Sequence, residues 1–561
     1  MISERRGAAI ECVYLPAFAD MLIKNLRTLW VEGKLFPSPE KDRETERQRD
    51  RKGAFLHQRR KSIKRHMSRR ALILGTGAAI GVVGARKWRL GAERALPVDL
   101  AHSAILKVDQ TFLNDASGMS HTPVARHVIV TAGSNEEVET RLLNEVALSQ
   151  EVEQPMIASG PRLSQGGQSI AFNGATVSLN QGFVVPYPGL LSYKTTGGTR
   201  WSSVIDTLDG HGFSPSVMQP YNDFSVAGAF ATNAHGWSTQ LGSVGSTALS
   251  LRMIKADGSL VTCARRTNSE LFRASMGGYG LFGVITEVQL QMAPNARLRR
   301  LTRGMKADDL PMMLAEQATE HPEVVMAYGQ TSLSQDDFLS DAQLISYHRE
   351  VDQTYLPPAP QESHYTDLDA SAFRAQAGSD RNKQLRWWME RNVEPRFGRT
   401  TTRNATLNRP IGPMIDPRDT HSNIQQGYFI PPEGAADFIS ACRDHIPNSY
   451  QDLIDFQMCF VSKDDESVLT YAADNRIAFH LTFCQERSTR ADLDMQRLNR
   501  ALIDRALSLG GSFYLPYRLH ATLDQIEAAY PNVAEFAKLK REYDPEGRFS
   551  NALWKDYLDA F

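Results

Sequence analysis

Three glycine-rich segments carry the residue types best suited to binding a ligand. They are "SGPRLSQGGQ" (159–168), "DFSVAGAFATNAHGWSTQLGSVGS" (223–246) and "GGYGLFG" (277–283), and each follows a strand-like run. Bare backbone N–H groups in such turns bind anions such as a pyrophosphate, and Arg162 and Ser164 add side-chain donors. The small residues of the second segment let the backbone lie flat against a large planar ring. Three such segments in this order are much stronger evidence for a ligand site than one alone.

Several polar side chains near these segments could act on a substrate. His235 could polarise a bound group, or it could hold its loop through backbone hydrogen bonds. Tyr517 and Arg518 could face a substrate, and a phenol can donate a hydrogen bond or act as a base when its pKa falls. In a strand, however, alternate members of this run would point into solvent. Arg403 could stabilise a developing negative charge from the middle of the chain, or it could lie in a surface loop.

The elements that must position the glycine-rich segments form an alternating series. A strand is expected at 128–130, followed by a helix that begins with a capping box at Ser134 and Glu137, and by a second strand at 155–158. Asp257-Gly258 predicts a two-residue hairpin turn. The alternation over 284–292 is typical of a half-buried strand.

Composition changes after Pro294, which indicates a second domain. The runs "IDFQMCFV" (454–461) and "RIAFHLTFC" (476–484) alternate apolar residues with others and predict an antiparallel sheet. Helices should end the chain, one of them with a capping box at Asn532 and Glu535.

The N-terminal region differs from the rest. Residues 1–66 include a highly charged stretch and are expected to form a basic, disordered extension. Residues 67–90 contain "ALILGTGAAIGVVGA", which is too short to span a bilayer easily but fits a signal or membrane-anchoring segment behind "SRR". The alternative is a buried Ala/Gly-rich helix. We therefore expect the protein to be membrane-associated or exported to the periplasmic side.

Composition sets further limits. The 561 residues carry a net charge of −1, which gives no argument for nucleic-acid binding. The five cysteines are dispersed and lack C-x-x-C spacing, which predicts buried thiols and no metal site; they are Cys12, Cys263, Cys442, Cys459 and Cys484.

The order and wording of these motifs resemble one family. "SVAGAFATNAHG" (225–236), "ELFRA" (270–274) and "GGYGLFGVI" (277–285) are similar to segments of the vanillyl-alcohol oxidase superfamily, which has a PCMH-type FAD domain. Within it, the chain looks closest to the aldonolactone oxidases and the decaprenylphosphoryl-ribose oxidases. The resemblance covers 120–295 well and 500–558 fairly well, and it is weaker between them.

The resemblance implies an α+β fold: a two-subdomain PCMH-type FAD-binding domain (120–295), a cap or substrate domain with an antiparallel sheet (296–500), and a C-terminal segment packing back on the FAD site (501–561). It also implies that FAD contacts the following residues: Ser159, Gly160, Pro161, Arg162, Leu163, Ser164, Gly166, Gly167, Pro220, Ser225, Val226, Ala227, Gly228, Ala231, His235, Gly236, Trp237, Ser238, Ile285 and Tyr514.

Two departures from the family pattern bear on the chemistry. Leu163 stands where many members have a histidine bonded to the flavin, so noncovalent FAD is expected. Tyr517 stands where the ribose oxidases have a lysine, and a phenol supplies no positive charge. Ribose oxidation by the same machinery is therefore in doubt.

These expectations combine into one function and two alternatives. The resemblance implies an FAD-dependent oxidase or dehydrogenase that oxidises an alcohol carbon of a sugar, an aldonolactone or a lipid-linked sugar, with Tyr517, Arg518 and Arg403 as the candidate catalytic residues. One alternative is a noncatalytic, membrane-tethered flavin-binding subunit. The other is the oxidase half of a two-enzyme epimerase with a reductase partner.

Overall fold

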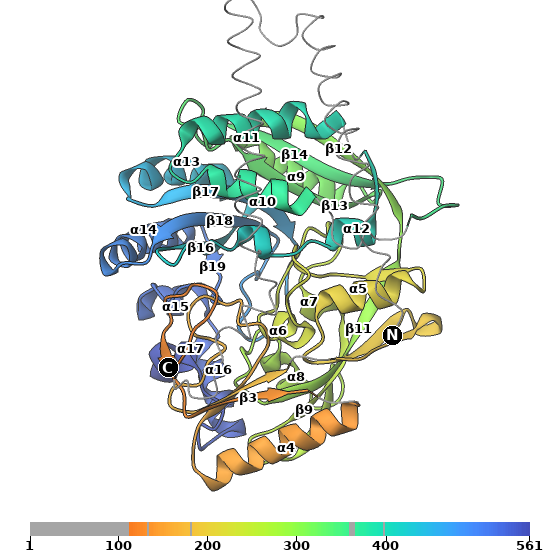
Figure 1. Ribbon diagram of the computed structural model, residues 1–561, viewed down its shortest axis with the longest axis vertical. Coiled ribbons are helices and arrows are strands. Elements are labelled where there is room, and N and C mark those ends of the chain that lie inside the picture. Colours follow the sequence, from red (N-terminus) through yellow and green to blue (C-terminus); the bar gives the residue numbers. More distant parts are fainter. Residues whose placement is uncertain (1–111, 132–133, 180–181, 358–364, 397–398) are drawn as a thin grey trace, which may run out of the picture. The chain divides into compact units, whose positions relative to one another are not determined.

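The computed structural model describes residues 112–131, 134–179, 182–357, 365–396 and 399–561 (Figure 1). The chain divides into two compact units, and the described residues belong to the unit Ala95–Phe561. The expected extension at 1–66 and the signal-like segment at 67–90 lie outside the described residues. No helix within the described ranges is long and apolar enough to cross a bilayer.

A small parallel sheet positions the first glycine-rich segment. Its strands run in the order β3-β5-β4, and helix α4 connects β3 to β4. Ser134 caps α4 by accepting a hydrogen bond from the Glu137 amide at 3.3 Å, and the buried Val138, Leu142 and Val146 form its inner face, as the sequence predicted. The bounds are β3 Arg126–Val130, α4 Asn135–Glu151, β4 Met156–Ser159 and β5 Ala175–Leu179. The short strands β1 (Phe112–Leu113) and β2 (Thr122–Pro123) pair separately.

A six-stranded antiparallel sheet positions the other two segments. Its order is β10-β9-β11-β7-β6, and β8 pairs with the end of β11. β9 and β10 form the predicted hairpin, but its turn is longer than the two residues expected, because the Lys255 amide donates to the Ser259 carbonyl with Gly258, at φ +79°, between them. The bounds are β6 Val184–Tyr187, β7 Ser192–Thr196, β8 Phe213–Pro215, β9 Ala248–Ile254, β10 Leu260–Ala264 and β11 Val284–Pro294, with helices α5 Trp201–Asp209, α6 Val226–Ala231, α7 Val244–Thr247 and α8 Ser269–Ser275.

The predicted antiparallel sheet of the second half has eight strands, in the order β15-β12-β14-β13-β17-β18-β16-β19. Helices α9, α13 and α14 pack on it (Figure 1). Phe438 of α13, for example, contacts Phe479 of β18 with ring centroids 4.9 Å apart. The strands are β12 Arg297–Lys306, β13 Val324–Thr331, β14 Asp341–Arg349, β15 Thr400–Thr402, β16 His421–Ile430, β17 Asp452–Val461, β18 Arg476–Glu486 and β19 Ser512–Phe513. The helices are α9 Leu310–Thr319, α10 Tyr365–Ala375, α11 Asp380–Asn392, α12 Arg403–Leu407, α13 Ala435–His445 and α14 Thr489–Ser508.

The C-terminal segment contacts both halves. β19 joins the eight-stranded sheet beside β16, and the Met156 amide of β4 donates to the Arg548 carbonyl at 2.7 Å. Helix α16 was expected to begin with a capping box, but the Asn532 side chain makes no capping hydrogen bond in the described structure. The helices are α15 Leu523–Ala529, α16 Val533–Tyr543 and α17 Ala552–Asp556.

The four cysteines in the described part of the chain are buried free thiols, as the sequence predicted: Cys263, Cys442, Cys459 and Cys484. The mixed helix and strand content and the antiparallel sheets are likewise as expected. The boundaries between an FAD domain and a cap domain stay a prediction.

Candidate active site

One cavity connects the glycine-rich segments with the eight-stranded sheet. From the first half it is lined by residues of all three segments, which we call the glycine loops (159–168, 223–246 and 277–283). From the second half it is lined by five polar side chains of β16, β17 and β18, which we call the cap wall: Gln425, Asp455, Gln457, His480 and Thr482. Tyr514, Pro516 and Tyr517 of the C-terminal segment also line it.

The first glycine loop divides into a part that faces the cavity and a part that holds the loop in place. Residues 159–164 line the cavity, with Arg162 in a left-handed conformation at φ +52°. The Gly166 amide donates to Gln168 Oε1 at 2.9 Å, and the Gly167 amide donates to Asp115 Oδ2 at 2.8 Å. Because these two N–H groups already have protein acceptors, Gly166 and Gly167 shape the loop instead of offering donors to a ligand.

The Arg162 side chain anchors the same loop. Its Nε donates to the Asn114 carbonyl at 3.2 Å, and its Nη1 lies 3.5 Å from Ser178 Oγ. Burial lowers the pKa of the guanidinium, and the nearby Asp115 opposes that shift. Arg162 is 3% exposed and lines the cavity, whereas the partners of its guanidinium, Asn114 and Ser178, do not line it, so the side chain holds the loop in place.

The second glycine loop contains a short helix that the sequence did not reveal. Ser225 begins α6 by accepting a hydrogen bond from the Gly228 amide at 3.3 Å. A side chain at Gly160 would collide with Ser225 Oγ, so the backbone of the first loop packs directly against a side chain of the second. The members of this loop and its approach that line the cavity are Pro220, Ser225, Ala227, Gly228, Ala231 and His235.

Four residues assigned to the cofactor from this loop lie outside the cavity formed by the described residues. Val226 is fully buried in the core, and a side chain at Gly236 would collide with the Met218 carbonyl. Trp237 stacks on Tyr328 with ring centroids 4.2 Å apart. Ser238 Oγ accepts from the Leu241 amide at 3.2 Å. Val226, Gly236 and Ser238 therefore serve packing and turn formation within the first half, and Trp237 packs between the two halves.

The third glycine loop brings backbone close to backbone. Gly283 has φ +153°, and a Cβ there would lie 2.5 Å from the Ile254 carbonyl oxygen. Tyr279, Gly280, Gly283 and the following Ile285 line the cavity. Only a residue without a side chain fits at Gly283, which explains this glycine by packing and by its backbone conformation.

His235 lies where the second loop meets the cap wall. Its ring is 4.9 Å from His480 and 5.3 Å from Phe429, measured between centroids. Its Nδ1 lies 3.8 Å from Cys459 Sγ. Burial, helped by His480, holds the pKa of His235 well below its ordinary value, so the imidazole is neutral at neutral pH.

The C-terminal segment supplies two tyrosines whose positions the glycine loops fix. The Tyr514 hydroxyl donates to the Thr232 carbonyl at 2.9 Å. Gln168 Nε2 donates to the carbonyls of Leu515 and Tyr517 at 2.7 and 2.9 Å. Burial, with a smaller contribution from Tyr514, raises the pKa of Tyr517, so its phenol keeps its proton. Tyr517 is therefore suited to donate a hydrogen bond and is a poor base.

The two arginines considered as catalytic lie outside the cavity lined by described residues. Arg403 is buried and donates to the carbonyls of Pro215 and Ser216. Arg518 pairs with Asp492, with Nη2 3.0 Å from Oδ2. Both cations are already engaged, so each stabilises the arrangement of neighbouring segments.

Sequence reasoning missed the cap wall. The register pairs Gln457 with His480, and it pairs Thr482 with both Asp455 and Gln425, which brings these side chains to one face. The apolar members of the same strands, such as Phe456 and Phe479, face the core. The available signal was the polar half of the alternation: Asp455, Gln457, His480 and Thr482 interrupt strands that are buried on both faces.

Asp455 has a distinct electrostatic setting. Among the described residues that line the cavity, it is the only carboxylate. Burial raises its pKa from the ordinary value, while Arg386 and a 2.7 Å hydrogen bond from Gln457 Nε2 oppose the shift. A carboxylate with a raised pKa is a stronger base than an exposed one.

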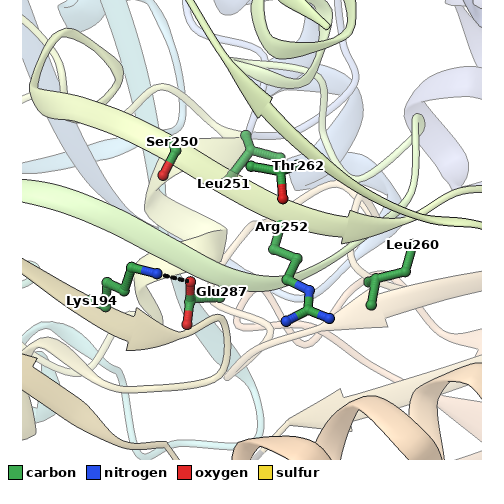
Figure 2. A pocket seen from close by; sticks show the side chains of 7 residues that line it. All are labelled: Lys194, Ser250, Leu251, Arg252, Leu260, Thr262 and Glu287. Carbon is green, nitrogen blue, oxygen red and sulfur yellow. Dashed lines mark ion pairs between the residues drawn. The ribbon is translucent and has the colours of Figure 1, made fainter. Parts of the chain in front are cut away.

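A second depression lies away from the glycine loops, on the six-stranded sheet. Figure 2 shows its lining of β-sheet side chains, with Lys194 Nζ paired to Glu287 Oε1 at 3.0 Å. The glycine loops and the cap wall contribute no residue to it among those described. We therefore assign the site to the cavity between the glycine loops and the cap wall.

Comparisons with known proteins agree with this assignment. Residues 127–264 match a family described as an FAD binding domain. A cytokinin dehydrogenase 7 of Oryza sativa subsp. japonica is 30% identical over 179 residues, which are 30% of this chain and 34% of that protein. An alditol oxidase of a Streptomyces species is 25% identical over 380 residues, which are 65% of this chain and 81% of that protein.

A third relative is a Neurospora crassa protein named as a D-arabinono-1,4-lactone oxidase, 33% identical over 97 residues, which are 17% of each chain. The chain spans about a third of the length of the cytokinin dehydrogenases that it matches.

The residues present fit the cofactor that the family match implies. Gly160, Gly228 and Gly280 line the cavity without side chains, and Arg162 supplies a buried cation beside them. The fold and the cavity together define a protein with a PCMH-type FAD-binding domain. The match of residues 127–264 and the relatives named above agree with the resemblance of the chain to the vanillyl-alcohol oxidase superfamily.

Proposed function

We propose that the protein is an FAD-dependent oxidoreductase that oxidises an alcohol carbon of a polyhydroxylated substrate: a sugar, an aldonolactone or a lipid-linked sugar. The observation that carries this proposal is the cap wall. Five polar side chains face the same cavity as the glycine loops, and their amide, hydroxyl, carboxylate and imidazole groups can bind several substrate hydroxyls at once. Relatives named as alditol oxidase and D-arabinono-1,4-lactone oxidase support the same substrate class.

The bound FAD supplies an acceptor for the hydride that leaves the alcohol carbon. The protein must position that carbon, and it must accept the proton of the hydroxyl. Gln425, Gln457 and Thr482 bind neighbouring hydroxyls, and Tyr517 donates a hydrogen bond to a substrate oxygen. Asp455 takes the hydroxyl proton, because its carboxylate is buried, has a raised pKa and faces the cavity.

We propose that the FAD is held without a covalent bond. Leu163 lines the cavity, and its hydrocarbon side chain has no nucleophile. Acid precipitation of the purified protein should therefore release the flavin into the supernatant. A yellow precipitate with a colourless supernatant would contradict this.

The central test is anaerobic reduction of the bound flavin. Purified protein should be yellow, and its flavin absorption should bleach when a substrate from a panel of polyols, aldonolactones and prenyl-phosphate sugars is added. A colourless protein that takes up no FAD would overturn the proposal. A protein that holds FAD but is bleached by no alcohol of the panel would favour the noncatalytic alternative.

A further inference from the structure

Three potential metal ligands from separate parts of the chain converge beside the cavity. His235 follows α6, Cys459 is on β17 and His480 is on β18. Each offers one ligand atom, and these atoms all lie within 4.8 Å of one another. Because more than 200 residues separate His235 from the other two, the spacing of cysteines in the sequence gave no sign of such a site.

The sheet register sets the geometry of this group. β17 and β18 pair Gln457 with His480 and Cys459 with Ala478, so Cys459 and His480 are diagonal neighbours on one face. His235 Nδ1 lies 3.8 Å from Cys459 Sγ. Two ligands of a tetrahedral zinc site, one nitrogen and one sulfur, lie about 3.6 Å apart for ordinary bond lengths. The observed separation is close to that value.

The three side chains of this group do not satisfy all of their hydrogen-bonding atoms. His235 is 4% exposed, and its Nε2 has no hydrogen-bond partner among the described residues. An unpartnered buried polar atom costs about 1–3 kcal/mol, and the contact that the other ring nitrogen, Nδ1, makes with the Cys459 thiol is weak. A cation that uses a lone pair of the imidazole would give the cluster a strong interaction that the protein alone does not supply.

We propose that His235, Cys459 and His480 form a binding site for Zn²⁺. One sulfur and two imidazole nitrogens are ligands that zinc prefers, and three protein ligands leave a fourth position open. His235 and His480 both line the cavity, so the open position faces it and can hold a water or a ligand oxygen.

The protonation states are compatible with this site. Burial lowers the pKa of His480 to about 4, so its imidazole is neutral and has a free lone pair at neutral pH. Burial raises the pKa of the Cys459 thiol to about 12, and a bound zinc ion would displace its proton.

The test uses the full chain with its flavin bound, stripped of metal by a chelator and dialysed. Elemental analysis after addition of Zn²⁺ should find one zinc per chain. Co²⁺ in place of Zn²⁺ should give the ligand-field absorption of a four-coordinate site, at wavelengths longer than those of the flavin. Cys459→Ser and His480→Gln should each weaken zinc binding at least tenfold, whereas Cys442→Ser, at another buried thiol on α13, should not.

A chain that retains no zinc and gives no cobalt spectrum would overturn the site, as would unchanged zinc binding in both ligand variants. Flavin content and circular dichroism show whether each variant is folded, and His480→Gln decides the matter if Cys459→Ser is not. Zinc content is measured separately from flavin bleaching. A chain that binds zinc but is bleached by no alcohol would keep this site while the proposed activity fails.

Discussion

The glycine loops and the cap wall line the same cavity by opposite means. The glycine loops contribute mainly backbone and small side chains: Gly160, Gly228 and Gly283 lie where a larger residue would enter the cavity or collide with a neighbour. The cap wall contributes side chains with specific chemistry, aligned by the register of three strands. The first surface therefore fits the shape of a ligand, and the second can distinguish between ligands.

This difference predicts which property of the protein is lost when each surface is mutated. Bulk added to a glycine loop should expel the cofactor, with little effect on substrate preference. A chemical change in the cap wall at constant volume should leave the cofactor in place and change turnover or substrate affinity. Variants that separate flavin content from kinetics test the comparison directly.

The largest effect is expected for Asp455→Asn. The variant keeps the shape of the side chain but loses the proton acceptor, so kcat/KM should fall by about 10²- to 10⁴-fold while flavin content is retained. Steady-state kinetics with the best substrate of the panel measure this. Asp465→Asn, at an exposed loop carboxylate, is the matched control. Near-normal turnover by Asp455→Asn would remove this residue from the mechanism.

Gly228→Val tests the glycine loops. A Cβ at this position would lie 2.8 Å from Ser225 Oγ, which caps α6, and the added methyl groups would enter the cavity. Overpacking costs about 1–3 kcal/mol, so FAD should bind about 10- to 100-fold more weakly. Flavin titration by fluorescence measures the change.

The control for this variant is Gly189→Val, because a Cβ at Gly189 meets nothing within 4 Å. If Gly228→Val held FAD as tightly as the parent protein, the second loop would not be a cofactor surface.

Thr482→Val tests the cap wall by removing one hydroxyl at nearly constant volume. The loss of one hydrogen bond to substrate, about 0.5–1.5 kcal/mol, should raise KM about 2- to 10-fold and leave flavin content unchanged. Thr262→Val, in the depression of Figure 2, should change neither. Equal effects of the two variants would argue against substrate binding at Thr482.

The smallest effect concerns stability alone. Burial by itself raises the pKa of Asp492, but His520 and Arg518 outweigh this and hold the pKa below its usual range. A carboxyl with a lowered pKa contributes stability above its unfolded value of about 3.9, and this contribution is lost as the pH falls through the folded pKa.

Asp492→Asn should therefore lower the free energy of unfolding by about 1 kcal/mol at pH 7, and the gap to the parent protein should shrink on acidification towards pH 3. Urea unfolding at the two pH values measures this, with the exposed Asp474→Asn as control. A gap that grows on acidification would show that Asp492 is not stabilised as a carboxylate.

Local patterns in the sequence predicted much of the fold. The cap of α4 at Ser134, the position of the hairpin at Gly258 and the alternation in β11 each depend on interactions within a few residues, so they were correctly predicted. The capping box at Asn532 was wrong, and α6 was missed because alanine and glycine give no amphipathic pattern over six residues.

The residues of the site also differ in whether local sequence patterns could predict them. The sequence by itself determined where the chain lacks side chains, because glycine is visible as a residue type, and so the glycine loops could be located. The tertiary structure alone decided which face of β17 and β18 lines the cavity. It also decided that His235 lies next to Cys459 and His480. Strand register and the packing of the second loop on the sheet are long-range contacts, and no local pattern encodes the distances that they set.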